Sequence, residues 1–262
     1  MRFPIRRLMN SLSKKVLIIG ISSMWCLAIL SASFPFAVAQ PTDSRLPIVL
    51  IHGYAQDRSV WNTWVSWLRE DNFMNIYPIK FQHDDECGSA QEHALELSVF
   101  IDGILEETGR DQVNIVGHSK GGLDARAYLS TGTVKVANLI MIGTPNAGSP
   151  AAFWDVTGCP AGAARDLFPQ SAATRVDDHP ENTNYFTIAG NWLPDNWCLF
   201  GLLWVPDGGI CIIIGEDDGL VGVQSVRSSP EYTPLGEDFP YDHFNLLRQH
   251  DVYEMALTVL NQ

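Results

Sequence analysis

Ser119 stands at the centre of Gly-His-Ser-Lys-Gly, a Gly-x-Ser-x-Gly pattern at 117–121. The β-branched stretch 112–116 before it predicts a buried strand, and 122–129 after it has the spacing of a helix. A strand, a tight turn and a helix form the context in which a serine Oγ is left exposed as a nucleophile. We therefore expect Ser119 to be a nucleophile. The alternative is a glycine-rich turn with an incidental serine.

A nucleophilic serine needs a general base, and three histidines follow Ser119 in the chain. His179 precedes the strand predicted at 184–189, which is too early for a base that follows the last strand. His250 lies inside a predicted C-terminal helix, where a packed or solvated histidine is the default. His243 lies in a loop just before that helix, and we expect it to be the base.

A carboxylate must orient that base, and an acidic triplet follows the apolar run 212–214. Asp218 is the expected acid, because Gly219 after it allows a sharp turn that presents its side chain. Asp217 is the fallback. The triplet could also be a solvated turn or an unplanned cation site.

Acyl transfer also needs backbone N–H groups for the oxyanion. The Lys120 amide directly follows the serine. The Tyr54 amide follows the strand predicted at 46–51 and is the expected second donor. We interpret the Lys120 side chain as incidental, a solvated or salt-bridged cation.

Strand and helix patterns alternate along the chain, which predicts an α/β fold with a mostly parallel central sheet and helices on both faces. A helix at 89–108 is expected to turn Leu95, Val99, Ile101 and Leu105 inward. The remaining predicted elements are a helix at 61–71, strands at 75–79, 136–142 and 184–189, and a helix at 246–260.

The long segments 146–181 and 190–215 are rich in Gly, Pro and Ala yet carry many large apolar side chains. Long loops of this kind are usually functional. We expect them to form a loop-rich cap that binds substrate, and the alternative is a satellite cluster packed on the sheet. The expected substrate-binding residues are Phe153, Trp154, Trp192 and Trp204.

Residues 1–39 carry a basic start, an apolar run and an Ala-Val-Ala site, which predicts a secretory signal peptide, with an uncleaved membrane anchor as the alternative. Residues 40–262 then form a single catalytic domain. Removing 1–39 takes five of the 17 Lys and Arg and none of the 30 Asp and Glu, so the formal charge becomes −18. Such a charge repels nucleic acid phosphates and anionic lipid headgroups, and it favours solubility outside the cell. We expect a monomer with no nucleic acid partner.

Four cysteines remain in the predicted mature chain, an even number that allows three pairings. Cys198 and Cys211 flank one loop and could close it, which leaves Cys87 with Cys159. Four reduced thiols are the alternative. No C-x-x-C pattern or ligand-spaced histidine accompanies them, so we expect no metal there.

Several motifs together carry a resemblance: Ile-Val-Leu-Ile-His-Gly at 48–53, the serine motif through Arg126, Gly-Thr-Pro-Asn-Ala-Gly-Ser at 143–149, Asp-Gly-Leu-Val at 218–221 and Asp-His at 242–243. In this order they resemble secreted bacterial triacylglycerol lipases of the α/β-hydrolase superfamily. The resemblance implies Ser119, Asp218 and His243 as a triad, with the Tyr54 and Lys120 amides as oxyanion hole.

The resemblance also implies a structural Ca²⁺ in larger lipases of this group, bound by an aspartate two residues after the histidine. Asn245 occupies that position here, so we expect no cofactor. The expected function is a secreted serine hydrolase of apolar acyl esters, such as lipids met at a lipid–water interface. One alternative is an esterase for short, aryl (feruloyl-type) or polyester substrates, and another is a catalytically silent binding module.

Overall fold

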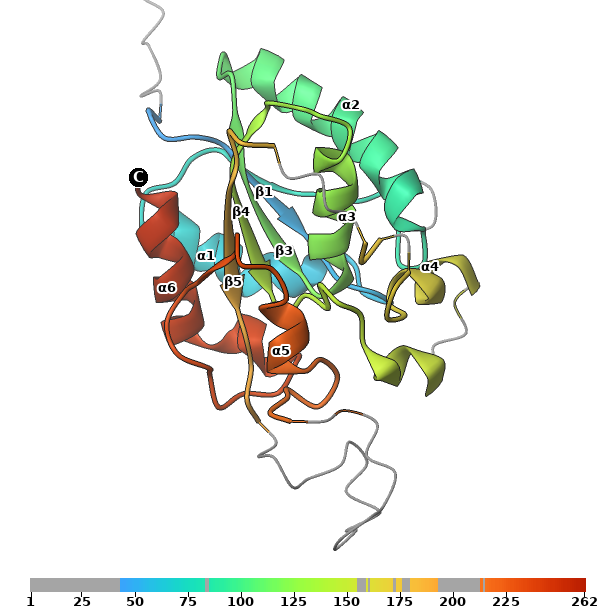
Figure 1. The fold of residues 1–262 in the computed structure, drawn as a ribbon. Coiled ribbons are helices and arrows are strands. Elements are labelled where there is room, and N and C mark those ends of the chain that lie inside the picture. The colour runs from blue at the N-terminus through green and yellow to red at the C-terminus, as the bar shows by residue number, and fades with distance from the viewer. Residues whose placement is uncertain are drawn as a thin grey trace, which may run out of the picture. The chain divides into compact units, whose positions relative to one another are not determined.

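In the part of the chain that the structure describes, six parallel strands form one sheet in the order β2-β1-β3-β4-β5-β6, with helices on both faces (Figure 1). The structure is a computed structural model that describes residues 43–82, 85–154, 159, 161–171, 173–175, 180–192, 213 and 215–262. The strands are β1 (Ile48–Ile51), β2 (Ile76–Pro78), β3 (Val113–His118), β4 (Val136–Ile142), β5 (Asn184–Ile188) and β6 (Thr233–Pro234). The helices are η1 (Arg58–Trp61), α1 (Asn62–Glu70), α2 (Ala90–Thr108), α3 (Lys120–Leu129), η2 (Pro150–Trp154), α4 (Ala161–Asp166), α5 (Val223–Val226), η3 (Asn245–Arg248) and α6 (His250–Leu260).

The fully buried central strands explain why the sheet has two apolar cores. Along β1, Val49 and Ile51 pack into the core beneath α2 and α3, whereas Ile48 and Leu50 pack into the core beneath α1 and α6. This alternation follows from the two-residue period of a strand, and a strand that is apolar on both faces is typical of a parallel sheet. The predicted parallel α/β architecture is confirmed.

Helix α2 begins with a capping box, in which Ser89 and Glu92 bond each other's backbone N–H groups. The prediction that Leu95 and Val99 face inward is wrong, because their side chains are 72% and 76% exposed. The predicted positions do not form one stripe. Residues six apart, such as Leu95 and Ile101, point about 120° away from each other around a helix. The buried stripe instead follows 90, 93, 97, 101 and 104.

The C-terminal helix predicted at 246–260 is two helices, η3 and α6, separated by Gln249 in an extended conformation. His250 is the first residue of α6, and its side chain is 58% exposed. The short elements α5 and β6 were not predicted.

Among the helices of the described residues, none has the length and apolar composition that crossing a bilayer requires. The predicted signal peptide and most of the 190–215 loop lie outside the described residues.

Candidate active site

Ser119 lies in the turn between β3 and α3, at the carboxyl edge of the sheet. Its backbone has φ 53° and ψ −126°, a strained conformation for a residue with a side chain. A Cβ on Gly121 would lie 2.4 Å from the carbonyl oxygen of Ile51, so only glycine allows α3 to approach β1 so closely. Ser119 is 8% exposed rather than freely exposed as predicted, and it lines a cavity.

His243 and Asp218 are joined by a hydrogen bond of 2.7 Å between Nδ1 and Oδ2, although they lie on separate loops. The other carboxylate oxygen, Oδ1, accepts the backbone N–H groups of Leu220 and Val221 at 3.0 and 2.7 Å. The backbone N–H of His243 also donates to the Asp218 carbonyl at 2.9 Å. Since the carboxylate accepts the Nδ1 proton, Nε2 is left as the acceptor of the neutral ring.

Asp217 is buried beside this pair but points elsewhere. Its Oδ1 accepts the N–H of Gly219 at 2.7 Å. Burial raises the pKa of Asp217 to about 6, with a smaller contribution from the neighbouring Asp218. The structure therefore brings Asp218, and not the fallback Asp217, to His243.

The predicted oxyanion loop at 52–54 follows β1 and is held by two residues that the sequence analysis missed. The side-chain oxygen of Gln56 accepts the Gly53 N–H at 3.0 Å. His118 lies 3.1 Å from the same oxygen through Nδ1 and 3.0 Å from the His243 carbonyl oxygen through Nε2. Burial, with the nearby His243, lowers the pKa of His118 to about 3, so the ring is neutral. The signal that could have found His118 is its place directly before the serine, at the first x of Gly-x-Ser-x-Gly.

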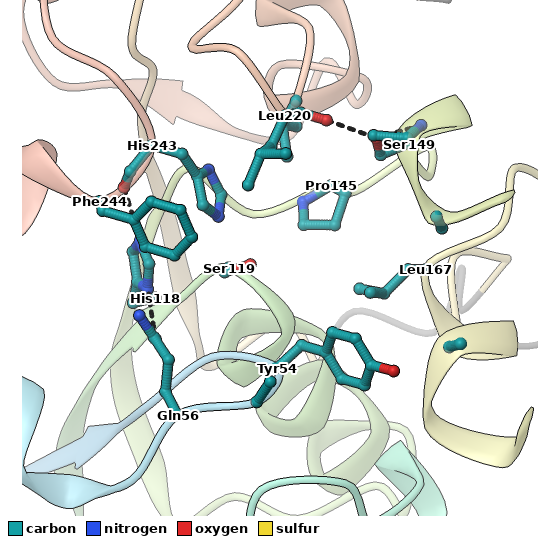
Figure 2. A pocket seen from close by; sticks show the side chains of 15 residues that line it. Tyr54, Gln56, His118, Ser119, Pro145, Ser149, Leu167, Leu220, His243 and Phe244 are labelled. Atoms are coloured by element: carbon teal, nitrogen blue, oxygen red, sulfur yellow. Dashed lines mark hydrogen bonds between the residues drawn. The ribbon is translucent and has the colours of Figure 1, made fainter. Parts of the chain in front are cut away.

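Ser119 and His243 open into one apolar cavity of about 330 Å³ (Figure 2). Figure 2 shows Phe244 on the His243 side, and Tyr54 and Leu167 on the side away from it. The cavity is lined by Tyr54, Ala55, Gln56, His118, Ser119, Pro145, Ser149, Ala151, Ala152, Ala164, Leu167, Leu220, Val221, His243 and Phe244. Small and aliphatic side chains dominate the wall, and Phe244 was not predicted.

Phe153 and Trp192, the two predicted substrate-binding aromatics whose side chains the structure describes, are not among the residues that line this cavity. Phe153 is 65% exposed and stacks on Phe168, with ring centroids 4.5 Å apart. Trp192 is 53% exposed and packs over Gly219 beside the Asp218 loop. The side chain of Trp154 and all of Trp204 lie outside the described residues, as do His179, Cys198 and Cys211.

The Lys120 side chain is not solvated; it is 1% exposed, and Nζ lies 2.5 Å from Asp124 Oδ1. The second Asp124 oxygen lies 2.8 Å from His93 Nδ1. Burial opposes the charge on Asp124, yet the Lys120 ammonium and His93 bring its pKa below the usual value. Lys120 is salt-bridged, one of the two forms expected, but inside the protein.

The structure contains the disulfide Cys87–Cys159, one of the expected pairings, with Cα atoms 5.3 Å apart. Asn245, which stands where the resemblance implies a calcium-binding aspartate, donates its side-chain N–H to Asp242. Within the described ranges, no three His, Cys, Asp or Glu side chains are grouped so that they could bind a metal ion.

Comparison with known proteins identifies the family. Residues 45–183 match the family Lipase (class 2). The chain belongs to the class 2 lipase family. It is 32% identical over 128 residues to a triacylglycerol lipase of Burkholderia plantarii, and 31% identical over 114 residues to one of Pseudarthrobacter phenanthrenivorans. The alignments span 45% and 40% of this chain, but 35% of the length of each relative.

Solved structures extend the likeness of this class 2 lipase across the fold. The mature Bacillus licheniformis lipase BlEst2 is 24% identical, with a TM-score of 0.64 over 85% of this chain and 95% of that one. Aspergillus fumigatus lipase B is 16% identical, with a TM-score of 0.55 over 83% of this chain and 53% of that one. The chain therefore has the α/β-hydrolase fold.

Proposed function

We propose that this class 2 lipase hydrolyses apolar carboxylic esters through an acyl-enzyme. The observation that carries the proposal is the apolar cavity into which Ser119 and His243 both open, with Asp218 bonded to the far side of the His243 ring. The proposed nucleophile and the proposed base, whose Nδ1 is bonded to Asp218, thus line the same apolar cavity. Together they are the requirements of acyl transfer from a lipid-like ester.

In the proposed reaction, His243 Nε2 accepts the Ser119 hydroxyl proton as Oγ attacks the ester carbonyl carbon. Asp218 stabilises the resulting imidazolium and keeps the ring oriented. The Tyr54 and Lys120 amides are the proposed donors to the oxyanion. His243 then gives its proton to the departing alcohol, and a water molecule activated by the same nitrogen releases the acid and restores Ser119.

His118 has a positioning role in this proposal. Its neutral ring lies between the Gln56 oxygen and the His243 carbonyl oxygen, and Gln56 in turn accepts the Gly53 N–H. The oxyanion loop and the loop of the base are therefore connected through one buried side chain. A neutral ring carries a single N–H, so it donates to one of these two oxygens at a time.

The substrate class follows from the wall of the cavity. Apolar side chains stabilise a bound acyl group by about 0.8 kcal/mol for each methylene removed from water. A space of about 330 Å³ holds a chain of limited length, and this favours a second candidate, an esterase for short-chain or aryl esters. We further propose that the protein acts as a secreted monomer without a cofactor, that residues 1–39 are removed on export, and that it meets esters at a lipid–water interface.

The test is a rate profile of the purified protein over p-nitrophenyl acetate, butyrate, octanoate and palmitate, with and without emulsified triacylglycerol. We expect rates to rise with acyl length until the cavity is filled. Ser119→Ala should remain folded and inactive, and a phosphonate should label Ser119 alone. Wild-type rates in folded Ser119→Ala would contradict the proposal. A maximum at acetate would favour the short-chain esterase, and N-terminal sequencing of exported protein tests removal of 1–39.

A further inference from the structure

The segment at 85–90, between β2 and α2, contacts the oxyanion loop. The Ala55 N–H donates to the Glu86 carbonyl oxygen at 2.9 Å, and His52 Nε2 lies 3.0 Å from Asp85 Oδ1. Ala55 has φ 53°, a left-handed conformation that is strained for a residue with a Cβ. A strained residue keeps such a conformation only when its surroundings hold it there. The 85–90 segment supplies one of these contacts.

The same segment is tied to α4 in two independent ways. Cys87 forms the disulfide with Cys159, two residues before α4 begins. At the other end of the helix, Asp166 Oδ2 accepts the N–H of Ala90, the first residue of α2, at 2.6 Å. The 85–90 segment is thus attached covalently just before the first residue of α4, and by a charge-assisted hydrogen bond at its last residue.

Asp166 also faces the buried charge cluster behind the serine. Its Oδ2 lies 4.0 Å from Lys120 Nζ, which is itself bonded to Asp124. Partial burial raises the pKa of Asp166, while the Ala90 N–H and Lys120 act in the opposite direction. The carboxylate therefore connects α4 both to α2 and to the first turn of α3.

Helix α4 forms one wall of the cavity. Ala164, within the helix, and Leu167, just after it, line the cavity. Figure 2 shows Leu167 on the side away from His243. The Leu167 carbonyl oxygen accepts the Ser149 N–H at 2.8 Å, so this wall continues into the loop after β4. Leu167, which lines the cavity, directly follows Asp166, which bonds the start of α2. A shift of Asp166 therefore displaces the wall of the cavity.

We propose that Asp166 and the Cys87–Cys159 disulfide are positioning groups that set acyl-chain selectivity, by holding the α4 wall at a fixed distance from the oxyanion loop. The inference rests on the proposed function. The wall contacts the acyl chain away from the carbonyl, so loosening it removes binding that long chains have and acetate lacks. A purely structural role predicts lower stability with an unchanged acyl-length profile.

The experiment compares Asp166→Ala, Asp166→Asn and the double variant Cys87→Ser/Cys159→Ser on p-nitrophenyl acetate and octanoate. Asp166→Ala and the double variant should lower the octanoate-to-acetate ratio of kcat/KM about tenfold, the effect of losing contact with one to two methylenes. The change should appear in KM for octanoate, with kcat for acetate within about twofold of wild type. Asp166→Asn keeps an oxygen for the Ala90 N–H and should restore about half of the logarithmic loss.

Asp102→Asn is the matched control. It breaks another Lys–Asp ion pair, Lys135–Asp102, with side chains 40% and 53% exposed and neither residue lining the cavity. It should leave the ratio unchanged. Amide hydrogen exchange gives a readout that does not depend on activity. Exchange at Ala55 and across 161–167 should accelerate in the double variant, while exchange in α6 should not change.

The outcomes separate the two proposals. If the wild-type protein hydrolyses none of the esters, the proposed function fails. If it hydrolyses them and both loosened variants keep the wild-type octanoate-to-acetate ratio, the inference fails. An unchanged exchange rate at Ala55 and 161–167 in the double variant would overturn it as well, even where low stability prevents kinetic measurement.

Discussion

The two sides of the cavity are built differently. On the side of the proposed reaction, Ser119, Asp218 and His243 lie at the carboxyl edge of the sheet and are fixed by backbone hydrogen bonds, glycine contacts and short side-chain bonds. On the far side, the described contacts that hold the α4 wall are the Asp166 carboxylate, the Cys87–Cys159 disulfide and the backbone hydrogen bond from Ser149 to Leu167. The geometry of the reacting groups therefore depends on the sheet, whereas the shape of the cavity that would hold the acyl chain depends on a few long-range contacts.

The largest expected effect is on the reaction side. Asp218→Asn should lower kcat about ten-thousand-fold for every ester, because the amide no longer stabilises the imidazolium and favours the wrong tautomer. Asp217→Asn, one residue away, should stay within about threefold of wild type, since Asp217 bonds Gly219 and not His243. Steady-state kinetics on butyrate esters measure both. Similar losses in the two variants would show that the orienting acid lies elsewhere.

A smaller effect is expected where the backbone of Gly143 packs directly against the Asp218–His243 pair. A Cβ on Gly143 would lie 3.2 Å from both Asp218 Oδ2 and His243 Nδ1, and Gly143 has φ 57°. Gly143→Ala should lower kcat about a hundredfold by displacing this pair. Gly132→Ala is the control, with φ 77° and nothing within 4 Å of its Cβ. It should lose about 1 kcal/mol of stability and no activity. Equal kcat in both variants would contradict the prediction.

The acyl side should respond through selectivity alone. Ala164→Leu adds volume to the α4 wall and should lower kcat/KM for octanoate about tenfold relative to acetate. Val99→Leu adds a methylene to an exposed position of α2 outside the cavity and serves as control. An equal loss of kcat/KM on both esters in Ala164→Leu would mean that a change in the wall also disturbs the reacting groups, and would contradict the difference between the two regions.

The smallest effect concerns stability. The folded-state pKa of Asp217 is raised from 3.8 to about 6, so the folded protein binds more protons than the unfolded chain between these values. Asp217 therefore lowers stability as pH rises through this window, and the full penalty remains above it. Asp217→Asn, with an oxygen retained for Gly219, should gain up to about 2 kcal/mol near pH 8 and about nothing near pH 3.5. Thermal melts at both pH values decide this, and a loss near pH 8 would refute it.

Local patterns predicted much of the sheet and the candidate reacting groups. The strands predicted at 112–116 and 136–142 correspond to β3 (Val113–His118) and β4 (Val136–Ile142), and the Gly-x-Ser-x-Gly motif can be recognised because its steric demands are local. Helix α2 was located correctly from its amphipathic pattern, but two of its predicted inward positions were wrong. Which face of a helix is buried depends on what packs against it, and period alone did not resolve this.

The sequence by itself determined the order of the elements, the parallel sheet and the residue types suited to acyl transfer, because these follow from local periodicity and turn chemistry. Only the tertiary structure brought Asp218, rather than Asp217, into contact with His243 and placed the Lys120 side chain in the interior. It also placed alanines and Leu167 around the cavity, while Phe153 and Trp192 lie outside its lining. These outcomes depend on contacts between residues such as Asp166 and Ala90, which are 76 positions apart. Chain spacing carries no information about such pairs, because their proximity is created by the packing of the helices on the sheet.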